Sequence, residues 1–216
     1  MQVGVKGTPE QVAELTEKIG SLVELSELKI THLGSYDLIF DLDFDMDRMY
    51  WTDYLDLEDT PIILGTAGIQ LEGLFSEYAV KPNSEIIGMN TLPTFINRDL
   101  AEVCLVHPDD QVIFEPILEQ LGFKCSWVQS RVGFVTPRVV LMIINEAYYT
   151  VQEGTASKED IDLGMKLGTN YPKGPFEWAE AIGIEYVYLT LEAIYEDTKD
   201  PRYKICPLLK TEFLSS

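Results

Sequence analysis

Residues 156–178 read ASKEDIDLGMKLGTNYPKGPFEW, and this stretch carries the strongest structural information in the chain. The S-K-E-D segment that begins at Ser157 fits a capping box, in which side chains satisfy the first N–H groups of a helix. It therefore predicts a helix that starts after Ser157. The prolines of the following Y-P-K-G-P-F-E segment interrupt this helix, because proline lacks a backbone N–H. A second, apolar helix is expected at Glu177–Ile182.

The sequence on both sides of this stretch is also helical. Residues 132–140 read VGFVTPRVV, and apolar residues recur at three- and four-residue spacings from Arg138 to Glu153. Such spacing is typical of a helix with one buried face. Gly154 suits the end of this helix because glycine accepts a left-handed backbone, and a further helix is predicted at Glu185–Asp197. We therefore expect residues 130–216 to form a helical domain.

Residues 1–129 have a different pattern, in which short apolar runs alternate with helical stretches. Strands are predicted at Gln2–Lys6, Ser21–Leu28, Asp37–Phe44, Pro61–Leu64, Glu85–Met89 and Lys124–Val128, and helices at Pro9–Ile19 and Val112–Leu121. Strands that alternate with helices are typical of an open α/β sheet. The predicted fold class is α/β plus all-α.

The composition argues against several classes of protein. The chain has 216 residues and a formal net charge of −20, which disfavours nucleic acid as a partner because its phosphates would be repelled. No apolar run is long enough for a membrane-spanning helix, and the N-terminus does not resemble a signal peptide. Cys104, Cys125 and Cys206 have no C-x-x-C spacing and predict neither a zinc site nor a disulfide framework. We expect a cytoplasmic protein that does not bind membranes.

Residues 132–140 and 156–178 together resemble the helical C-terminal domain of the 3-hydroxyacyl-CoA dehydrogenases. Weaker similarity extends to three upstream segments, residues 36–47, 65–71 and 86–103. The resemblance implies a Rossmann-like dinucleotide domain in residues 1–129, shortened because a helical stretch before Tyr36 is missing. It implies a helical dimerisation domain in residues 130–216.

The family's four catalytic positions can be compared with this sequence. In the family, a histidine takes the proton of a 3-hydroxyl group while hydride passes to NAD, and a glutamate orients the histidine. The glutamate position is Glu102, which matches, but the histidine position is Asn90, whose amide cannot carry a proton away. A serine and an asparagine hold the substrate oxygen in the family, and their positions here are Ala67 and Pro137. Loss of the general base is expected to reduce the rate by about 10²–10⁴.

NAD is the cofactor that the resemblance implies, and its pyrophosphate requires G-x-G-x-x-G after the first strand. The loop here reads GTPEQV, so that only Gly7 matches, and Pro9 removes an N–H donor. Thr8 and Gln11 instead fit a capping box, in which the start of the helix satisfies its own N–H groups. Glu27 lies about twenty residues further on, where a ribose-binding acid is expected.

Four aspartates, Asp41, Asp43, Asp45 and Asp47, alternate along the chain. Alternate residues of a strand share a face, so we expect their carboxylates to lie together near the end of the strand at Asp37–Phe44. A calcium or magnesium site is one interpretation. The EF-hand spacing is absent, however, and a solvated strand end is the favoured alternative. We therefore predict no metal site.

Two functional hypotheses follow. The first is the family activity, NAD-dependent oxidation of a 3-hydroxyacyl-CoA in fatty-acid metabolism, which the substitutions indicate is lost or much reduced. The alternative is a noncatalytic protein that binds an acyl-CoA-like ligand or a protein partner. In both cases the resemblance implies a homodimer formed through the C-terminal helices, and the apolar face of Arg138–Glu153 is compatible with such an interface.

Overall fold

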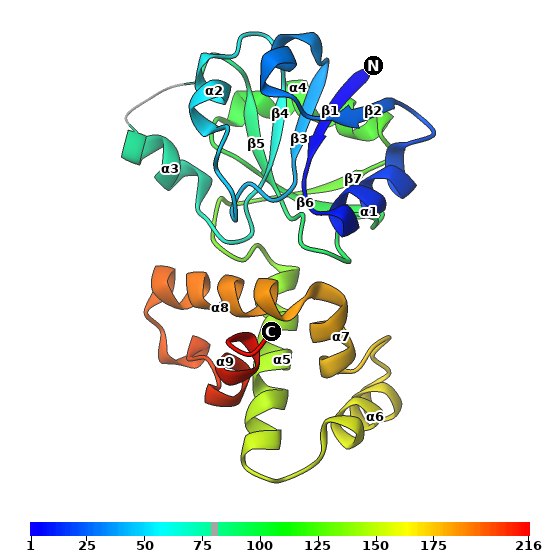
Figure 1. Ribbon diagram of the computed structural model, residues 1–216, viewed down its shortest axis with the longest axis vertical. Coiled ribbons are helices and arrows are strands. Elements are labelled where there is room, and N and C mark those ends of the chain that lie inside the picture. Colours follow the sequence, from blue (N-terminus) through cyan, green and yellow to red (C-terminus); the bar gives the residue numbers. More distant parts are fainter. Residues whose placement is uncertain (79–81) are drawn as a thin grey trace. The chain divides into compact units, whose positions relative to one another are not determined.

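The chain folds into two compact units, Met1–Phe134 and Val135–Ser216, in a computed structural model that describes residues 1–78 and 82–216 (Figure 1). The first unit contains a mostly parallel sheet with helices, and the second is entirely helical. The predicted fold class, α/β plus all-α, is confirmed. No helix in the described ranges is both long and apolar enough to cross a membrane.

Seven strands of the described chain form one sheet in the order β2-β1-β3-β4-β5-β6-β7. Their bounds are β1 Gln2–Lys6, β2 Glu24–Glu27, β3 Leu38–Asp41, β4 Ile62–Gly65, β5 Ile86–Met89, β6 Leu100–Leu105 and β7 Lys124–Val128. All neighbouring strands are parallel except β5 and β6. Because β2 and β3 lie on opposite sides of β1, the carboxyl ends of β1 and β3 flank a topological switch point. Open α/β sheets bind their ligands at such points.

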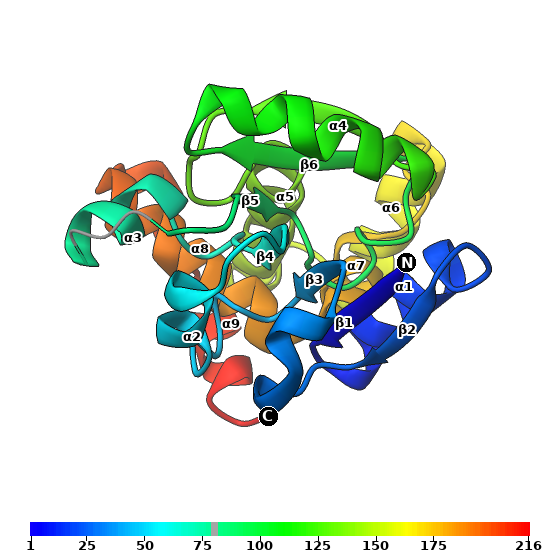
Figure 2. The same ribbon diagram turned by 90° about the horizontal axis from the view of Figure 1, so that it is seen from above.

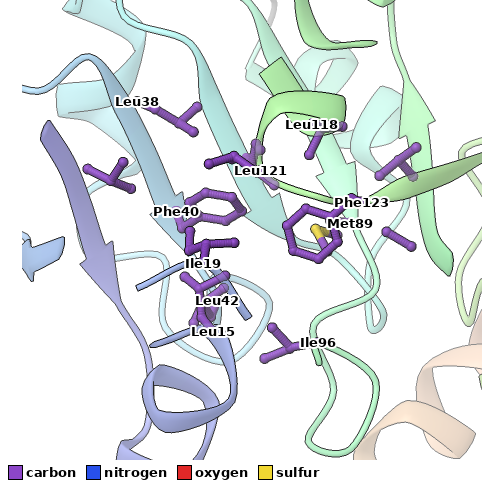
Figure 3. Packing of buried hydrophobic residues seen from close by; sticks show 14 of the residues in the cluster. Leu15, Ile19, Leu38, Phe40, Leu42, Met89, Ile96, Leu118, Leu121 and Phe123 are labelled. Atoms are coloured by element: carbon purple, nitrogen blue, oxygen red, sulfur yellow. The ribbon is translucent and has the colours of Figure 1, made fainter. Parts of the chain in front are cut away.

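Both faces of the sheet are covered, and the alternation of side chains along β3 shows why. Leu38, Phe40 and Leu42 pack against α1 (Pro9–Ile19) and α4 (Gln111–Gln120), as seen in Figure 3. Ile39 points to the other face, where it packs with residues of α2 (Trp51–Asp56), α3 (Leu71–Tyr78) and the 3₁₀ helix η1 (Ile30–Ser35). Figure 2 shows α4 running alongside β6, after the short 3₁₀ helix η2 (Pro108–Asp110). The unit thus has two apolar cores, one on each face of the sheet.

Two predicted strands were too long by several residues, and those predicted at Pro61–Leu64 and Glu85–Met89 differ from β4 and β5 by one residue at an end. A strand was predicted at Ser21–Leu28, but the observed strand β2 covers only Glu24–Glu27. The predicted strand Asp37–Phe44 ends at Asp41, where the chain turns. There the Asp45 N–H donates to the Gly65 carbonyl, 3.1 Å away, and its carboxylate accepts the Gly68 N–H at 2.7 Å. These bonds to the β4 loop replace the extended backbone that the alternating aspartates predicted.

The helical unit is arranged around α5 (Thr136–Gln152), which contacts four other helices (Figure 1). These are α6 Lys158–Thr169, α7 Pro175–Ile182, α8 Ile184–Thr198 and α9 Pro207–Phe213, with the 3₁₀ helix η3 at Pro201–Tyr203. Asn145 is buried on α5 and joins it to the segment before α9. Its side chain donates to the Lys204 carbonyl at 3.0 Å and accepts the Cys206 N–H at 2.9 Å. This buried amide therefore has both of its polar ends satisfied.

The stretch at residues 156–178 joins two helices of this unit. Ser157 caps α6 by accepting the Asp160 N–H at 3.1 Å, as predicted. Asp162 of α6 accepts the N–H groups of Phe176 and Glu177 at 2.8 and 3.2 Å and so caps α7. The Glu177 carboxylate accepts the Gly174 N–H at 2.9 Å and pairs with Lys166. The residues that carry the resemblance thus hold α6 and α7 together.

Candidate functional site

The switch point between β1 and β3 is closed by the side chain of Gln11. This residue lies in the first turn of α1 and is 1% exposed. Its side-chain amide N–H groups donate to the carbonyls of Leu42 and Thr91, both at 2.9 Å, and its Oε1 accepts the Thr8 N–H at 3.0 Å. The Gln11 side chain therefore ties together the loops that follow β1, β3 and β5, at the edge where an α/β sheet opens to a ligand.

The loop after β1 does not fit the pyrophosphate of a dinucleotide. Such a group binds to unpaired backbone N–H groups at the start of a helix. Here the Gln11 side chain accepts the Thr8 N–H, the Thr8 hydroxyl accepts the Gln11 N–H at 3.4 Å, and Pro9 has no N–H. The predicted capping box is confirmed. A Cβ atom on Gly7 would lie 2.9 Å from the Leu42 Cβ, so this glycine is required by the close approach of two loops.

An open cavity of about 700 Å³ lies beside this closed switch point, at the carboxyl ends of β1 and β2. Gly7 and Glu27, the two residues predicted to contact a cofactor, both line it. Glu27 is exposed at the end of β2. The structure thus brings these two residues to one cavity, next to a helix start where the Thr8 and Gln11 N–H groups are already paired and Pro9 has no N–H.

The acidic run surrounds a lysine of the chain itself. The Lys6 ammonium lies 3.1 Å from Asp41, 2.5 Å from Asp43 and 3.6 Å from Asp47. The expectation of four carboxylates on one face of a strand is wrong, because the chain turns after Asp41. Within residues 1–78 and 82–216, no group of three or more His, Cys, Asp or Glu side chains is placed to hold a metal ion. Lys6 supplies the positive charge between these carboxylates.

Asp41 is not solvated, contrary to the expectation of a solvated strand end. Its side chain is fully buried and accepts hydrogen bonds from the Tyr54 hydroxyl at 2.9 Å and from Lys6 at 3.1 Å. Burial raises the pKa of Asp41 to about 7, although the nearby ammonium lowers it. Burial also raises the pKa of Asp45 to about 6, against the effect of the Gly68 N–H. Asp41 and Asp45 therefore hold their protons to a higher pH than most carboxyl groups do.

Asn90 and Glu102 face each other across the antiparallel pair of β5 and β6. The Asn90 N–H donates to the Glu102 carbonyl at 3.0 Å, and both residues are buried. The Asn90 Oδ1 accepts the Leu92 N–H at 3.4 Å. The structure thus places Asn90 and Glu102, the predicted positions of the histidine and the glutamate, side by side. Both histidines of the chain are exposed and lie elsewhere, His32 in η1 and His107 directly before η2.

The remaining two positions lie in different units. Ala67 is 1% exposed in the loop after β4, and its carbonyl accepts the Gly133 N–H at 2.7 Å. Its methyl side chain offers no hydrogen bond to a substrate. Pro137 is buried in the first turn of α5, where a missing N–H has no cost. Pro137 therefore suits its position at the start of α5, whereas the bond of Ala67 uses its backbone and would be open to any residue.

Two functional groups of this region could not be assigned from the sequence. Lys6 ends β1 and Tyr54 lies on α2, and neither residue belongs to a motif that marks it in the sequence. Their partner Asp41 lies 35 residues from Lys6 and 13 residues from Tyr54. The one available signal was the alternating aspartates, which require a nearby positive charge if any of them is buried.

Comparisons with known proteins find similarity to 3-hydroxyacyl-CoA dehydrogenases. Residues 133–215 match the family model described as 3-hydroxyacyl-CoA dehydrogenase, C-terminal domain. Over 200 residues the chain is 29% identical to a 3-hydroxybutyryl-CoA dehydrogenase of Clostridioides difficile, an alignment covering 91% of this chain and 70% of the relative. It is 42% identical over 94 residues to a probable 3-hydroxybutyryl-CoA dehydrogenase of Bacillus subtilis, covering 44% of this chain and 33% of that protein.

Solved structures show the same fold. The crystal structure of (S)-3-hydroxybutyryl-CoA dehydrogenase from Ralstonia eutropha is 23% identical and superposes with a TM-score of 0.75. That match covers 99% of this chain and 93% of the other. A structure of 3-hydroxybutyryl-CoA dehydrogenase from Escherichia coli is 28% identical with a TM-score of 0.61, and it covers 72% of this chain and 32% of the other.

Proposed function

This chain belongs to the 3-hydroxyacyl-CoA dehydrogenase family, and we propose that it is a noncatalytic member that binds an acyl-CoA-like ligand. In this proposal the family's NAD-dependent oxidation of a 3-hydroxyacyl-CoA is lost or much reduced. The protein is proposed to act as a homodimer. The competing hypothesis is that some dehydrogenase activity remains. The argument for it is the family membership.

The observation that carries the proposal is the buried side chain of Gln11. Its three hydrogen bonds join the loops after β1, β3 and β5. A dinucleotide that lay across the switch point would have to break these bonds and leave buried carbonyl groups without partners. Each such group costs about 1–3 kcal/mol, so the apparent affinity for NAD would be greatly reduced.

The reaction centre gives a second, independent argument. General-base catalysis requires a group that accepts the hydroxyl proton and holds it. Asn90 occupies the histidine position and cannot be protonated near neutral pH. Because Glu102 is kept opposite Asn90, it is the one family catalytic group that still has acid–base chemistry.

A second cavity, lined by residues of the helical unit, is the reason for proposing an acyl-CoA-like ligand. It measures about 580 Å³ and has mostly apolar walls, including Met142, Ile143, Ile161 and Met165. Volumes of about 300–1,000 Å³ with apolar linings are typical of small-molecule sites. An acyl chain fits this chemistry, since it gains free energy from each CH₂ group removed from water.

The first test measures oxidation of NADH in the presence of acetoacetyl-CoA. We expect no rate above that of a mixture without protein, because Asn90 stands at the predicted position of the base and the dinucleotide crevice is closed. Clear turnover that Glu102→Gln removes and Glu17→Gln leaves intact would contradict the proposal. Glu17 is a suitable control because it is exposed on α1, away from β5 and β6.

The second test measures ligand binding without turnover. In isothermal titration we expect acetoacetyl-CoA to bind and NAD not to bind. Met142→Glu should weaken acetoacetyl-CoA binding at least tenfold, because it places a charge in the apolar cavity. Met46→Glu, at an exposed position of the α/β unit, should leave it unchanged. If neither ligand binds, the proposed ligand is wrong and a protein partner becomes the better hypothesis.

A further inference from the structure

The apolar cavity of the helical unit has two arginines among the residues that line it. Arg138 lies in the first turn of α5, and Arg202 lies in η3. We infer that these two arginines hold the carboxylate of a free fatty acid whose alkyl chain fills the cavity. This inference rests on the proposed function, which places an acyl chain in the same cavity. It adds the head group, a negative charge attached directly to the chain.

The cavity follows α5 over several turns. The residues of this helix that line it run from Arg138 to Thr150, about 18 Å along the axis at a rise of about 1.5 Å per residue. Between these ends the walls are apolar, with contributions from Val139, Met142, Ile143, Ala147, Ile161 and Met165. A long apolar space suits an unbranched alkyl chain, because each CH₂ group removed from water favours binding.

The charges that line the cavity are separated along α5. Arg138 and Arg202 lie close together, because both guanidinium groups sit over the ring of Tyr203, 5.7 and 4.7 Å from its centroid. The N-terminus of α5, where the helix dipole is positive, is at the same end. Glu146 also lines the cavity, but it is exposed about two turns further along the helix. An anionic head group is therefore attracted to the arginine end.

Each arginine already has an aspartate beside it, but neither aspartate lines the cavity. The Arg138 Nη2 lies 3.7 Å from Asp197, and the Arg202 Nε lies 3.3 Å from Asp200. The Arg202 side chain is 65% exposed, and exposed ion pairs contribute little to stability. A guanidinium has five N–H donors, more than a single carboxylate engages, so a second carboxylate can bind to the same group.

A coenzyme A ester offers no charge at this position. The group next to the chain of an acyl-CoA is a neutral thioester, and the pantetheine arm separates it from the phosphates. With its chain in the cavity, an acyl-CoA would therefore place an uncharged carbonyl beside Arg138 and Arg202. A free acid places a carboxylate there, and a guanidinium forms strong, charge-assisted hydrogen bonds with a carboxylate.

The test titrates the intact protein with octanoate, 1-octanol and octanoyl-CoA by isothermal calorimetry. Octanoate should bind at least tenfold more tightly than 1-octanol, which has a chain of the same length but no charge. Arg202→Gln should weaken octanoate binding at least fivefold and leave 1-octanol binding unchanged, which also shows that the cavity is intact. Lys199→Gln is the matched control, because Lys199 is 63% exposed in the same unit but does not line the cavity.

The possible results separate this inference from the proposed function. Equal affinities for octanoate and 1-octanol, or unchanged octanoate binding in Arg202→Gln, would overturn the carboxylate site. Binding of octanoyl-CoA without binding of octanoate would overturn the inference and leave the acyl-CoA-like ligand in place. Binding of octanoate as expected, without binding of octanoyl-CoA, would support the inference and contradict the coenzyme A part of the proposed function. Absence of binding by all three ligands would overturn both.

Discussion

Gln11 and Lys6 determine which polar groups are available to a ligand at the carboxyl ends of β1 and β3. Each is a polar side chain whose hydrogen-bonding groups are used within the protein. Gln11 satisfies backbone groups that would otherwise face a ligand, and Lys6 neutralises carboxylates that would otherwise repel one another. These polar groups therefore make contacts within the chain. In a dinucleotide-binding protein, groups at this edge of the sheet remain available to the ligand.

Asp41 gives a prediction at this scale, because its ionisation is coupled to folding. Its pKa is about 7 in the folded protein and about 3.9 in an unfolded chain. Between about pH 4 and 7 the folded state thus binds more protons, and stability from this group is lost as the pH rises. Urea unfolding at several pH values should show that the free energy of unfolding, taken as wild type minus Asp41→Asn, falls across this range by up to about 4 kcal/mol.

The control for this experiment is Asp56→Asn, because Asp56 is exposed on α2. The difference between wild type and this variant should stay flat over the same pH range. A flat difference for Asp41→Asn as well would show that the buried carboxyl group titrates normally. That result would contradict the statement that burial raises the pKa of Asp41.

At the scale of elements, residues 156–178 act through backbone caps and not through catalytic chemistry. The Asp162 carboxylate accepts two N–H groups at the start of α7. A Cβ atom on Gly174 would lie 2.2 Å from the Asp162 Cγ, so glycine is required there by the approach of that carboxylate. The role of this segment in holding α6 and α7 together therefore does not depend on the residues at the proposed reaction centre.

Replacing this cap should loosen one helix. Asp162→Ala leaves two N–H groups without their acceptor and should lower the free energy of unfolding by about 1–3 kcal/mol. Hydrogen exchange should increase first at the amides of Phe176 and Glu177. The exposed Glu159→Ala on α6 serves as the comparison and should have little effect. Unchanged exchange at the start of α7 in Asp162→Ala would show that the cap contributes little.

Most elements could be predicted because their signals are local. The capping residues Thr8 and Ser157 each lie three residues from the N–H that they accept. The end of β3 could not be predicted, because the bonds of Asp45 come from the β4 loop. The sequence predicts the bond between Gln11 and Thr8, because these residues are neighbours in the chain. It does not predict the bonds of Gln11 to Leu42 and Thr91, which are 31 and 80 residues away. Sequence patterns therefore gave the capped helix, while the contacts that close the site depend on the fold.

At the scale of the whole molecule, association has to overcome a large negative charge. Two copies would each carry a formal net charge of −20, and their repulsion is screened by salt. The helical unit offers apolar surface that favours association. Leu163 and Leu167, one turn apart on α6, are 53% and 78% exposed. Exposed apolar side chains that share a helix face are typical of interaction surfaces.

We predict a homodimer that uses this α6 surface and becomes tighter as salt is added. Light scattering at micromolar concentration should give the mass of two chains, with more monomer at about 50 mM than at about 500 mM salt, because screening extends further at low ionic strength. Leu167→Glu should give monomers, since it places charge in the apolar contact. Val112→Glu is the matched control, because Val112 of α4 is also 78% exposed but lies in the α/β unit. A dimer that survives Leu167→Glu would place the interface elsewhere, and a wild-type monomer at all salt concentrations would refute the homodimer.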